Sequence, residues 1–410
     1  MSDFQTNLEK YADLAVKVGV NVQAGQTLVV NATIDAAPLV RLITKRAYKV
    51  GAKNVVVNWS DDVVNRTKFE LAPDELFKEF PEWRAKEVTE LAEQGAAFMS
   101  IVSSSPDLLK GIDPERIANN QKAAGTALST YRQYMMSDKV SWTVISAPSE
   151  GWAKMVFPDE STEKAVEKLW NAIFTAIRVD TDNPVEAWKQ HDANLHEKVD
   201  YLNGKRYKKL HYTAPGTDLT IELPEKHLWV GAGSVNEQGH EFMANMPTEE
   251  VFTVPLKTGV NGYVSSTKPL SYGGNIIDRF QLTFENGRIT EVQAEEGEEI
   301  LKQLVATDEG SHYLGEVALV PFNSPISQSN ILFFNTLFDE NASNHLAIGS
   351  AYAFCLEGGK KMSKEEQAEH GLNDSLTHVD FMIGSAEMDI DGIKENGTSE
   401  PVFRNCDWAF

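Results

Sequence analysis

The sequence predicts two parts of different class, an α/β region with a mostly parallel sheet followed by a region of mixed β structure. In the first part, short apolar strand patterns alternate with amphipathic helical patterns, which is typical of parallel strands joined by crossover helices. Near Thr181–Pro184 this alternation stops, and strand and hairpin patterns follow. We therefore expect an N-terminal α/β domain at residues 1–190 and a C-terminal β-rich domain at residues 191–410.

The elements of the first part follow in regular order. Asp35 stands where it would cap the helix at 36–48, and Gly51 follows the end of that helix. The expected helices cover residues 4–18, 36–48, 112–136 and 162–177, and the expected strands cover 27–30, 55–57, 98–102 and 142–145.

The second part begins with a polar helical pattern at 185–202. Asn286-Gly287 separates two alternating runs, which is a strong hairpin signal, and Asn396-Gly397 repeats it near the C-terminus. Helical patterns also cover 295–307 and 342–354. If the latter segment is helical, His345 and Tyr352 lie about two turns apart and share a face.

Length and composition indicate an ordinary globular protein. The chain has 410 residues, of which 42% are hydrophobic, enough for two or three domains with proper cores. This apolar content excludes a disordered chain, and the 27 Gly and 16 Pro exclude a collagen-like one.

The charge balance is strongly acidic. Lys and Arg total 38 against 60 Asp and Glu, which gives a formal net charge of −22. A field of this sign repels phosphate backbones and anionic lipids, so we expect neither nucleic acid nor membrane as a partner. The same carboxylates are potential ligands of divalent cations, although a solvated acidic surface explains most of them.

Cysteine usage and the N-terminal segment indicate a cytoplasmic protein. Cys355 and Cys406 are the two cysteines, and they form no Cys-x-x-Cys motif. The N-terminal residues lack a signal-peptide pattern, and no apolar run reaches the length of about 18 residues that a membrane span requires.

Several common catalytic motifs are incomplete. His240-Glu241 lacks the second His of a zinc-binding helix, and Gly233-Ser234 lacks the closing Gly of a nucleophile elbow. Gly358 and Gly359 precede Lys360 without the remaining residues of a phosphate-binding loop. We interpret these segments as turns.

A His-x-Asp pair in a strand-like segment suggests a metal site. His378 and Asp380 would point to the same side of a strand, because side chains two residues apart share a face. A histidine and a carboxylate with a common direction form half of a plausible divalent-metal site. The polar face of a half-exposed strand is the more common source of a lone pair of this kind.

Three further segments add acids and a second histidine. Glu316 interrupts an apolar run, and a buried carboxylate must be paired or bound to a cation. Glu250 enters another apolar strand, and His345 follows the acidic segment 339–344. Each signal is weak alone, but three carboxylates and two imidazoles are a normal complement for two hydrolytic metal ions.

The chain resembles the aminopeptidase T and aminopeptidase S family of two-metal aminopeptidases. The similarity runs nearly from end to end, and it includes two N-terminal segments, 25–31 and 51–59. The segments that look like the active-site blocks of the family are 246–253, 314–320, 339–343 with His345, 349–352 and 378–384.

The resemblance implies a fold, a site and partners. It implies an N-terminal α/β domain and a C-terminal pseudo-β-barrel domain that carries the site. It also implies a homodimer that cleaves short peptides. Glu316 would bridge two divalent cations, which could be zinc, cobalt or manganese, and Tyr352 would be the catalytic tyrosine. The implied metal ligands are Glu250, Glu316, His345, His378 and Asp380.

These roles suggest a hydrolytic mechanism. A metal-bound water has a pKa near about 7, so hydroxide is available at neutral pH to attack the N-terminal peptide bond. Tyr352 would stabilise the tetrahedral intermediate by donating a hydrogen bond to its oxyanion. Glu340 could orient His345, but an acid at the start of a helix is an equally good explanation of Glu340.

Two other functions fit parts of the pattern. A two-metal phosphoesterase would use a similar site, but it should hold phosphate with basic residues, and the site segments contain no Lys or Arg. A non-catalytic small-ligand binding protein would make the acid and histidine placements coincidental. Metal-dependent turnover of an amino-acid amide separates these readings.

Overall fold

The computed structural model describes residues 2–410, which form two compact units. Unit 1 comprises the chain up to Asp192 together with Gly233–Pro247, and unit 2 comprises Ala193–Ala232 and Thr248–Phe410. The division therefore falls inside helix α9 (Pro184–Lys205), and a short segment from the second half of the chain packs with unit 1.

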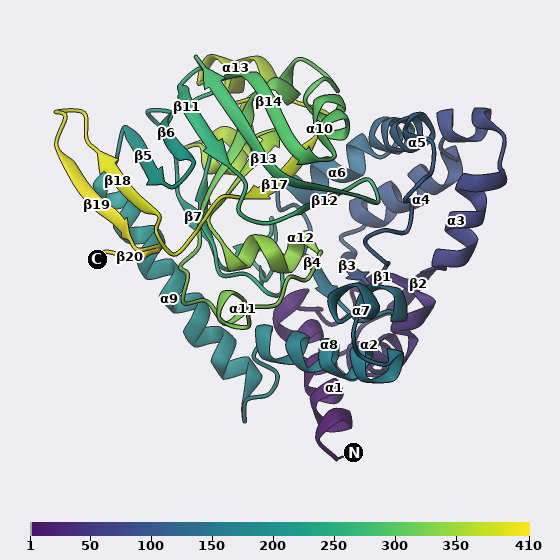
Figure 1. The fold of residues 1–410 in the computed structure, drawn as a ribbon. Helices are drawn as coiled ribbons and strands as arrows, with labels where there is room; N and C mark the ends of the chain where they lie inside the picture. The colour runs from purple at the N-terminus through teal and green to yellow at the C-terminus, as the bar shows by residue number, and fades with distance from the viewer. Residues whose placement is uncertain (1) are drawn as a thin grey trace. The chain divides into compact units, whose positions relative to one another are not determined.

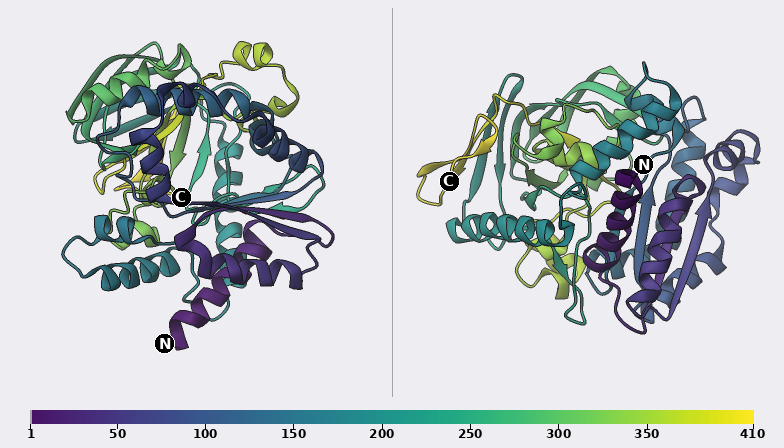
Figure 2. Two further views of the ribbon diagram at one scale, coloured as in Figure 1. Left: turned by 90° about the vertical axis from the view of Figure 1, so that its right-hand side faces the viewer. Right: turned by 90° about the horizontal axis from the view of Figure 1, so that it is seen from below.

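Unit 1 contains a parallel sheet with helices on both faces (Figures 1 and 2). Its strands run in the order β2-β1-β3-β4, and every neighbouring pair is parallel. Its elements are α1 (Ser2–Leu14), β1 (Thr27–Thr33), α2 (Ala37–Lys49), β2 (Asn54–Ser60), α3 (Asp62–Leu71), α4 (Glu82–Glu93), β3 (Ala97–Val102), α5 (Pro114–Ala127), α6 (Ser129–Met136), β4 (Trp142–Ser146), α7 (Glu150–Val156), α8 (Thr162–Ala176), β8 (Ser234–Val235) and β9 (Glu241–Phe242).

The sequence predicted the strands of this sheet correctly, but two helix details were wrong. Asp35 lies within a short 3-10 helix, so the residue before α2 is Ala36, which provides no side-chain cap. The expected helix at 112–136 is two helices, because the chain breaks at Leu128 between α5 and α6. Helices α3, α4 and α7 had no predicted counterpart.

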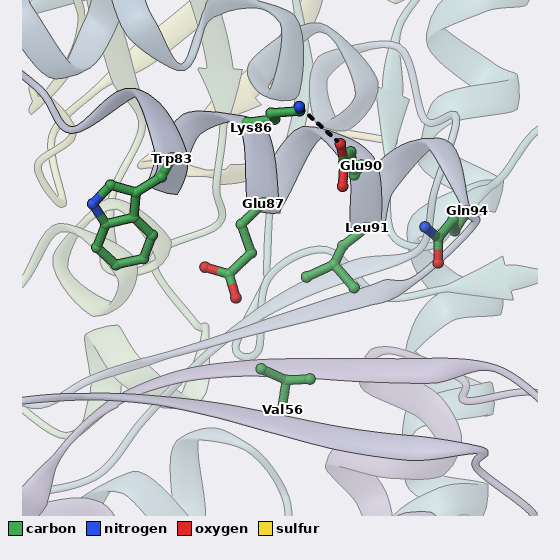
Figure 3. A pocket seen from close by; sticks show the side chains of 7 residues that line it. All are labelled: Val56, Trp83, Lys86, Glu87, Glu90, Leu91 and Gln94. Carbon is green, nitrogen blue, oxygen red and sulfur yellow. Dashed lines mark ion pairs between the residues drawn. The ribbon is translucent and has the colours of Figure 1, made fainter.

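A surface groove of about 440 Å³ lies between helix α4 and the edge strand β2 (Figure 3). Lys86 and Glu90 form an ion pair of 3.8 Å on its wall. The residues that line it are Val56, Trp83, Lys86, Glu87, Glu90, Leu91 and Gln94. They include no histidine or cysteine, so this groove offers no mixed nitrogen and oxygen ligand set.

Unit 2 is built mainly from antiparallel strands. The elements after α9 are β5 (Lys209–Ala214), β6 (Thr217–Glu222), β7 (Val230–Gly231), β10 (Val251–Thr253), β11 (Val260–Ser265), β12 (Leu270–Tyr272), β13 (Asn275–Glu285), β14 (Arg288–Glu296), α10 (Glu298–Val305), β15 (Leu314–Leu319), α11 (Pro325–Gln328), α12 (Thr336–Asp339), β16 (His345–Gly349), α13 (Lys364–Glu369), β17 (His378–Met382), β18 (Asp389–Ile393), β19 (Ser399–Arg404) and β20 (Asp407–Trp408).

Two antiparallel sheets organise these strands. A nine-stranded sheet has the order β12-β13-β11-β6-β5-β18-β19-β20, with β14 paired to β13. A five-stranded sheet has the order β17-β16-β15-β10-β7. One continuous apolar core packs between them, and it includes Leu210, Phe280, Val317 and Phe381. The predicted fold class is confirmed; among the described residues the strands form these sheets and no closed barrel.

Both predicted hairpins occur in unit 2. Asn286 and Gly287 have φ angles of 49° and 83° at the turn between β13 and β14, which suits the left-handed backbone of a tight hairpin. Asn396 and Gly397 lie between β18 and β19. The expected helix at 342–354 was wrong, because strand β16 occupies His345–Gly349, and Tyr352 follows the end of that strand.

Within residues 2–410, none of the helices combines the length and the apolar character that a bilayer crossing needs. Cys355 and Cys406 are both buried, and neither forms a disulfide bond with another described residue.

Candidate metal centre

Four neighbouring strands of the five-stranded sheet bring the sequence-predicted ligands together. Glu250 immediately precedes β10, Glu316 lies on β15, His345 lies on β16, and His378 and Asp380 lie on β17. These strands are consecutive in the order β17-β16-β15-β10, so segments far apart in the sequence become direct neighbours. The order of the sheet therefore places each strand that carries a predicted ligand beside another such strand.

The strand register leaves room between the ligands. Ala347 lies directly between Asp380 and Glu316 in the ladder, and Ala318 lies opposite His345. Directly paired residues point to the same face of a sheet, so small side chains separate the charged ones on this face. The short alanine side chains leave the space in which the carboxylates and imidazoles converge.

Glu316 is at the centre of the cluster. Its Oε1 lies 3.5 Å from Nε2 of His345, and its Oε2 lies 3.5 Å from Nε2 of His378. Each carboxylate oxygen therefore faces a different imidazole. Glu316, His345 and Glu250 form one group of potential ligand atoms within 4.8 Å of one another, and Glu316, His378 and Asp380 form another.

Backbone carbonyls set the orientation of both imidazoles. Nδ1 of His345 lies 3.0 Å from the carbonyl oxygen of Glu340, and Nδ1 of His378 lies 2.7 Å from that of Ser350. A carbonyl only accepts hydrogen bonds, so each Nδ1 carries the proton that it donates. Nε2 of each neutral ring then presents a lone pair to the carboxylates.

This arrangement places lone pairs against lone pairs. Glu250 Oε2 lies 3.0 Å from Nε2 of His345, and Asp380 Oδ1 lies 3.5 Å from Nε2 of His378. Both oxygens are buried, and neither accepts a well-aligned hydrogen bond. Either an extra proton on the imidazole or a cation between the groups removes the repulsion. The residues present therefore fit a divalent metal pair.

Without a cation, the cluster perturbs its own protonation. Burial alone would lower the pKa of His345, but the facing carboxylates of Glu250 and Glu316 raise that pKa well above the usual value. Burial raises the pKa of Glu250. Burial is the largest single influence on Asp380 and raises its pKa, but the charges of His378 and His345 together with hydrogen bonding outweigh burial, so the net shift is downward. Strongly perturbed, clustered groups of this kind are typical of functional sites.

Glu340 is a fourth buried carboxylate at this site. Glu340, His345 and Asp380 form a third group of potential ligand atoms within 4.8 Å. Burial and the charges of Asp380 and Glu250 raise the pKa of Glu340 well above its usual value. Its backbone carbonyl, and not its carboxylate, is what orients His345. The sequence analysis noticed Glu340 beside the predicted ligands. Its position at the expected start of a helix did not show whether Glu340 was part of the site or a surface residue.

A buried amide supports the segments that carry Glu250 and Glu340. Oδ1 of Asn341 accepts a 2.6 Å hydrogen bond from the backbone N–H of Glu249, the neighbour of Glu250. Nδ2 of Asn341 donates to the carbonyl of Leu337 at 2.9 Å. Asn341 thus ties the entry of β10 to the helix that precedes Glu340. Nothing in the sequence pattern identified this amide.

Tyr352 lies against the metal cluster. Its ring centroid is 4.7 Å from that of His378, and the ring of Phe354 stacks on it at 5.0 Å. Burial raises the pKa of its hydroxyl well above the usual value, so the group remains a neutral hydrogen-bond donor. Tyr352 reaches the site from a loop after β16, not from a helix shared with His345.

Among the residues that the structure describes, groups of three or more potential metal ligands occur only in this cluster. All of its members belong to unit 2. The cluster contains two imidazoles and four carboxylates, and four negative charges would balance two divalent cations. Mixed nitrogen and oxygen donors suit zinc, cobalt or manganese.

Comparisons with known proteins agree with this chemistry. Residues 4–408 match the thermophilic metalloprotease (M29) family. The chain is 69% identical to aminopeptidase AmpS of Bacillus subtilis (strain 168) over the whole length of both, and 54% identical to aminopeptidase 2 of Geobacillus stearothermophilus over 100% of this chain and 99% of that one. The structure of wild-type AmpT from Thermus thermophilus superposes with a TM-score of 0.92 at 42% identity, covering 99% of this chain and 100% of that one.

Proposed function

The chain belongs to the thermophilic metalloprotease (M29) family and is a metal-dependent aminopeptidase, and from that premise we propose how its residues remove the N-terminal residue of short peptides. The observation that carries the proposal is the position of Glu316. Its two carboxylate oxygens face two different imidazoles at equal distances of 3.5 Å. A carboxylate placed in this way suits a bridge between two cations.

The ligand set divides into two halves around this bridge. Glu250 and His345 would hold one cation, and His378 and Asp380 would hold the other. When bound, the two cations supply a nucleophile derived from water at neutral pH and polarise the scissile carbonyl. Glu340 is close enough to His345 and Asp380 to join the set as a further carboxylate.

Tyr352 acts on the oxygen of the scissile carbonyl. Its hydroxyl remains protonated at neutral pH, because burial raises its pKa. A neutral donor fixed beside His378 suits the oxygen that becomes negatively charged in the tetrahedral intermediate. The aromatic rings of Phe252 and Phe354 hold the phenol in place. We propose that Tyr352 stabilises this intermediate by a hydrogen bond.

A carboxylate-rich site would favour substrates with a free amino terminus. Carboxylate oxygens of Glu340 and Asp380 lie within 4.8 Å of each other. A protonated substrate amine would be attracted to these carboxylates, so the peptide would be bound by its N-terminal end. A blocked peptide would lose this interaction.

The finer properties of the enzyme are part of the same proposal. The donor set favours zinc, cobalt or manganese. We propose a homodimer, as the family resemblance implies; light scattering should give twice the chain mass of 45.5 kDa. The two buried cysteines, which form no disulfide among the described residues, support a reducing, cytoplasmic location.

Hydrolysis of aminoacyl-p-nitroanilides tests the proposal. Protein stripped by a chelator should be inactive, and zinc, cobalt or manganese should restore cleavage. The Glu316→Gln variant should bind metal poorly and lose at least about 10³-fold in kcat/KM, because the bridging charge is removed. N-acetylated substrates serve as the control for the free amine. Absence of turnover in folded, metal-loaded wild-type protein would refute the aminopeptidase mechanism proposed here.

A further inference from the structure

A second buried amide, Asn373, lies in the loop between α13 and β17. Its side chain is 3% exposed. Nδ2 donates to the carbonyl of Gly310 at 2.7 Å and to that of Gly349 at 2.6 Å. The backbone carbonyl of Asn373 accepts a 2.8 Å hydrogen bond from the N–H of Ala351. One residue therefore holds the chain on both sides of Ser350.

Ser350 is the link between this amide and the metal cluster. Its carbonyl accepts the 2.7 Å hydrogen bond from Nδ1 of His378, and its N–H donates to the carbonyl of Thr377 at 2.7 Å. Tyr352 follows two residues later. The segment 349–352 thus orients a metal-ligand candidate through a carbonyl and carries the candidate catalytic hydroxyl.

The other side of this segment is equally constrained. A Cβ atom at Gly315 would lie 2.2 Å from the carbonyl oxygen of Ser350 and 2.4 Å from that of Gly349. The segment therefore lies directly against the backbone of β15, one residue before Glu316. With Gly315 on one side and Asn373 on the other, the segment has little freedom to shift relative to the central carboxylate.

We propose that Asn373 is a positioning residue that sets the orientation of His378 and Tyr352 together. It acts through the backbone of 349–352 and touches neither substrate nor metal. This inference rests on the proposed function for its effect on turnover, but its effect on metal affinity is independent of peptide cleavage. A single amide controls both groups because both depend on the conformation at Ser350.

The loss of the hydrogen bonds from the Asn373 amide explains why a substitution there should disturb the segment 349–352. Alanine at 373 removes the Asn373 donor from the carbonyl of Gly349, and it leaves the carbonyl of Gly310 with only the N–H of Tyr313. Buried carbonyls without partners are unfavourable, so the segment should move to find new donors. Such a movement changes the direction of the Ser350 carbonyl, the tilt of the His378 ring and the position of the Tyr352 hydroxyl at once.

The experiment compares Asn373→Ala with Asn236→Ala. Asn236 is also a buried amide, at 5% exposure, but it lies in unit 1 and bonds to Ser141 and to a local turn. Both variants should lose thermal stability. Only Asn373→Ala should lose metal affinity, measured by competition with a chelating dye, by about ten-fold, and kcat at saturating metal by about 10- to 100-fold, with KM nearly unchanged.

A double variant tests the route of action. If Asn373 acts through Tyr352, then Asn373→Ala should reduce kcat much less in a Tyr352→Phe background than in the wild type, with metal saturating in both. Additive losses would contradict action through Tyr352. Asn373→Ser, which retains one donor, provides a milder variant if the alanine variant does not fold. Its metal affinity and kcat should lie between those of the wild type and those of Asn373→Ala.

The outcomes are distinct. Wild-type metal affinity and kcat in folded Asn373→Ala or Asn373→Ser protein would overturn the inference, and so would equal losses in Asn236→Ala. If the wild-type protein does not cleave peptide substrates, the proposed function fails, but the metal-affinity comparison still decides the role of Asn373.

Discussion

The parallel sheet of unit 1 and the five-stranded sheet of unit 2 both contain buried strands, yet they differ in charge. Strands β1 to β4 contain no Asp, Glu, Lys or Arg. The five-stranded sheet carries Glu316, His345, His378 and Asp380 on adjacent strands, with Glu250 at the start of another. Burial of a carboxylate is unfavourable without a compensating charge.

The difference indicates which sheet is built for folding and which for binding. An uncharged parallel sheet covered by helices reaches its full stability from its own residues. Burial opposes ionisation of Glu250 at the entry of β10 and of Glu340 in the short helix before β16, so the pKa of each is raised. Extra protons on the imidazoles or bound cations would balance the charges of this cluster. Four expectations follow from this contrast, and each can strengthen or break it.

The largest expected effect concerns the hydroxyl of Tyr352. Tyr352→Phe removes the donor but keeps the ring that packs on His378 and Phe354. We expect kcat to fall by about 10²- to 10³-fold, because a lost hydrogen bond to an oxyanion has effects of this size. Metal content, measured by elemental analysis, should remain that of the wild type. An unchanged kcat with normal metal content would remove Tyr352 from the mechanism.

Metal removal should affect the two units unequally. Cations that bind only the folded state stabilise it, so chelation should lower the thermal midpoint of unit 2 by several degrees. Unit 1 contains no comparable ligand group among its described residues and should respond little. Hydrogen exchange followed by mass spectrometry measures each unit separately. Equal deprotection of β1 and β16 after chelation would contradict the contrast.

The sequence was most informative where a local pattern decides the outcome. Strands β1 to β4 and the Asn286-Gly287 hairpin follow from apolar runs and turn residues, which act over a few neighbours. The prediction of a helix at 342–354 failed because β16 pairs with β15 and β17, and such pairing depends on residues far away in the chain. Tertiary pairing overrode a helical spacing of apolar residues.

The same distinction applies to the site. The resemblance and the His-x-Asp pattern pointed to five ligand candidates and Tyr352, which the structure brings into one cluster. The amides of Asn341 and Asn373 could not be identified, because the hydrogen bonds that link them to the site go to backbone groups 24 to 92 residues away. No sequence motif records a hydrogen bond to a distant carbonyl. Glu340 was noticed, but its burial beside Asp380 is a property of the fold.

One substitution made in both sheets should give opposite results. Thr33 on β1 is buried, and its hydroxyl has no hydrogen-bond partner, whereas the hydroxyl of Thr253 on β10 donates to the carbonyl of Leu228 at 2.9 Å. Thr33→Val should leave the free energy of unfolding unchanged or raise it by up to about 1 kcal/mol. Thr253→Val should lower it by about 1 kcal/mol, because the Leu228 carbonyl loses a donor.

Thermal unfolding of both valine variants measures this pair of effects, with the wild type as reference. Valine has nearly the shape of threonine, so packing is matched and the hydroxyl is the variable. Changes of the same sign at the two positions would show that the hydroxyl is not what distinguishes the sheets.

The smallest expected effect concerns charges at the surface of unit 2, which contrast with those buried in the ligand sheet. Hydrogen bonds from Lys205, from Lys394 and from Tyr207 lower the pKa of Glu400 to about 2. A carboxyl whose pKa is lower in the folded state stabilises the protein above its unfolded pKa near 4.5, and this contribution is lost as the pH falls toward 2. Glu400→Gln should therefore lower the thermal midpoint at pH 7 by about 1 °C, since exposed ion pairs contribute little. The difference from the wild type should shrink below pH 4.5. If the difference in thermal midpoint grew as the pH fell, the hydrogen bonds of Glu400 to Lys205, Lys394 and Tyr207 would not be the source of its lowered pKa. The contrast between weakly stabilising surface charges and the buried charges of the ligand sheet would then be wrong.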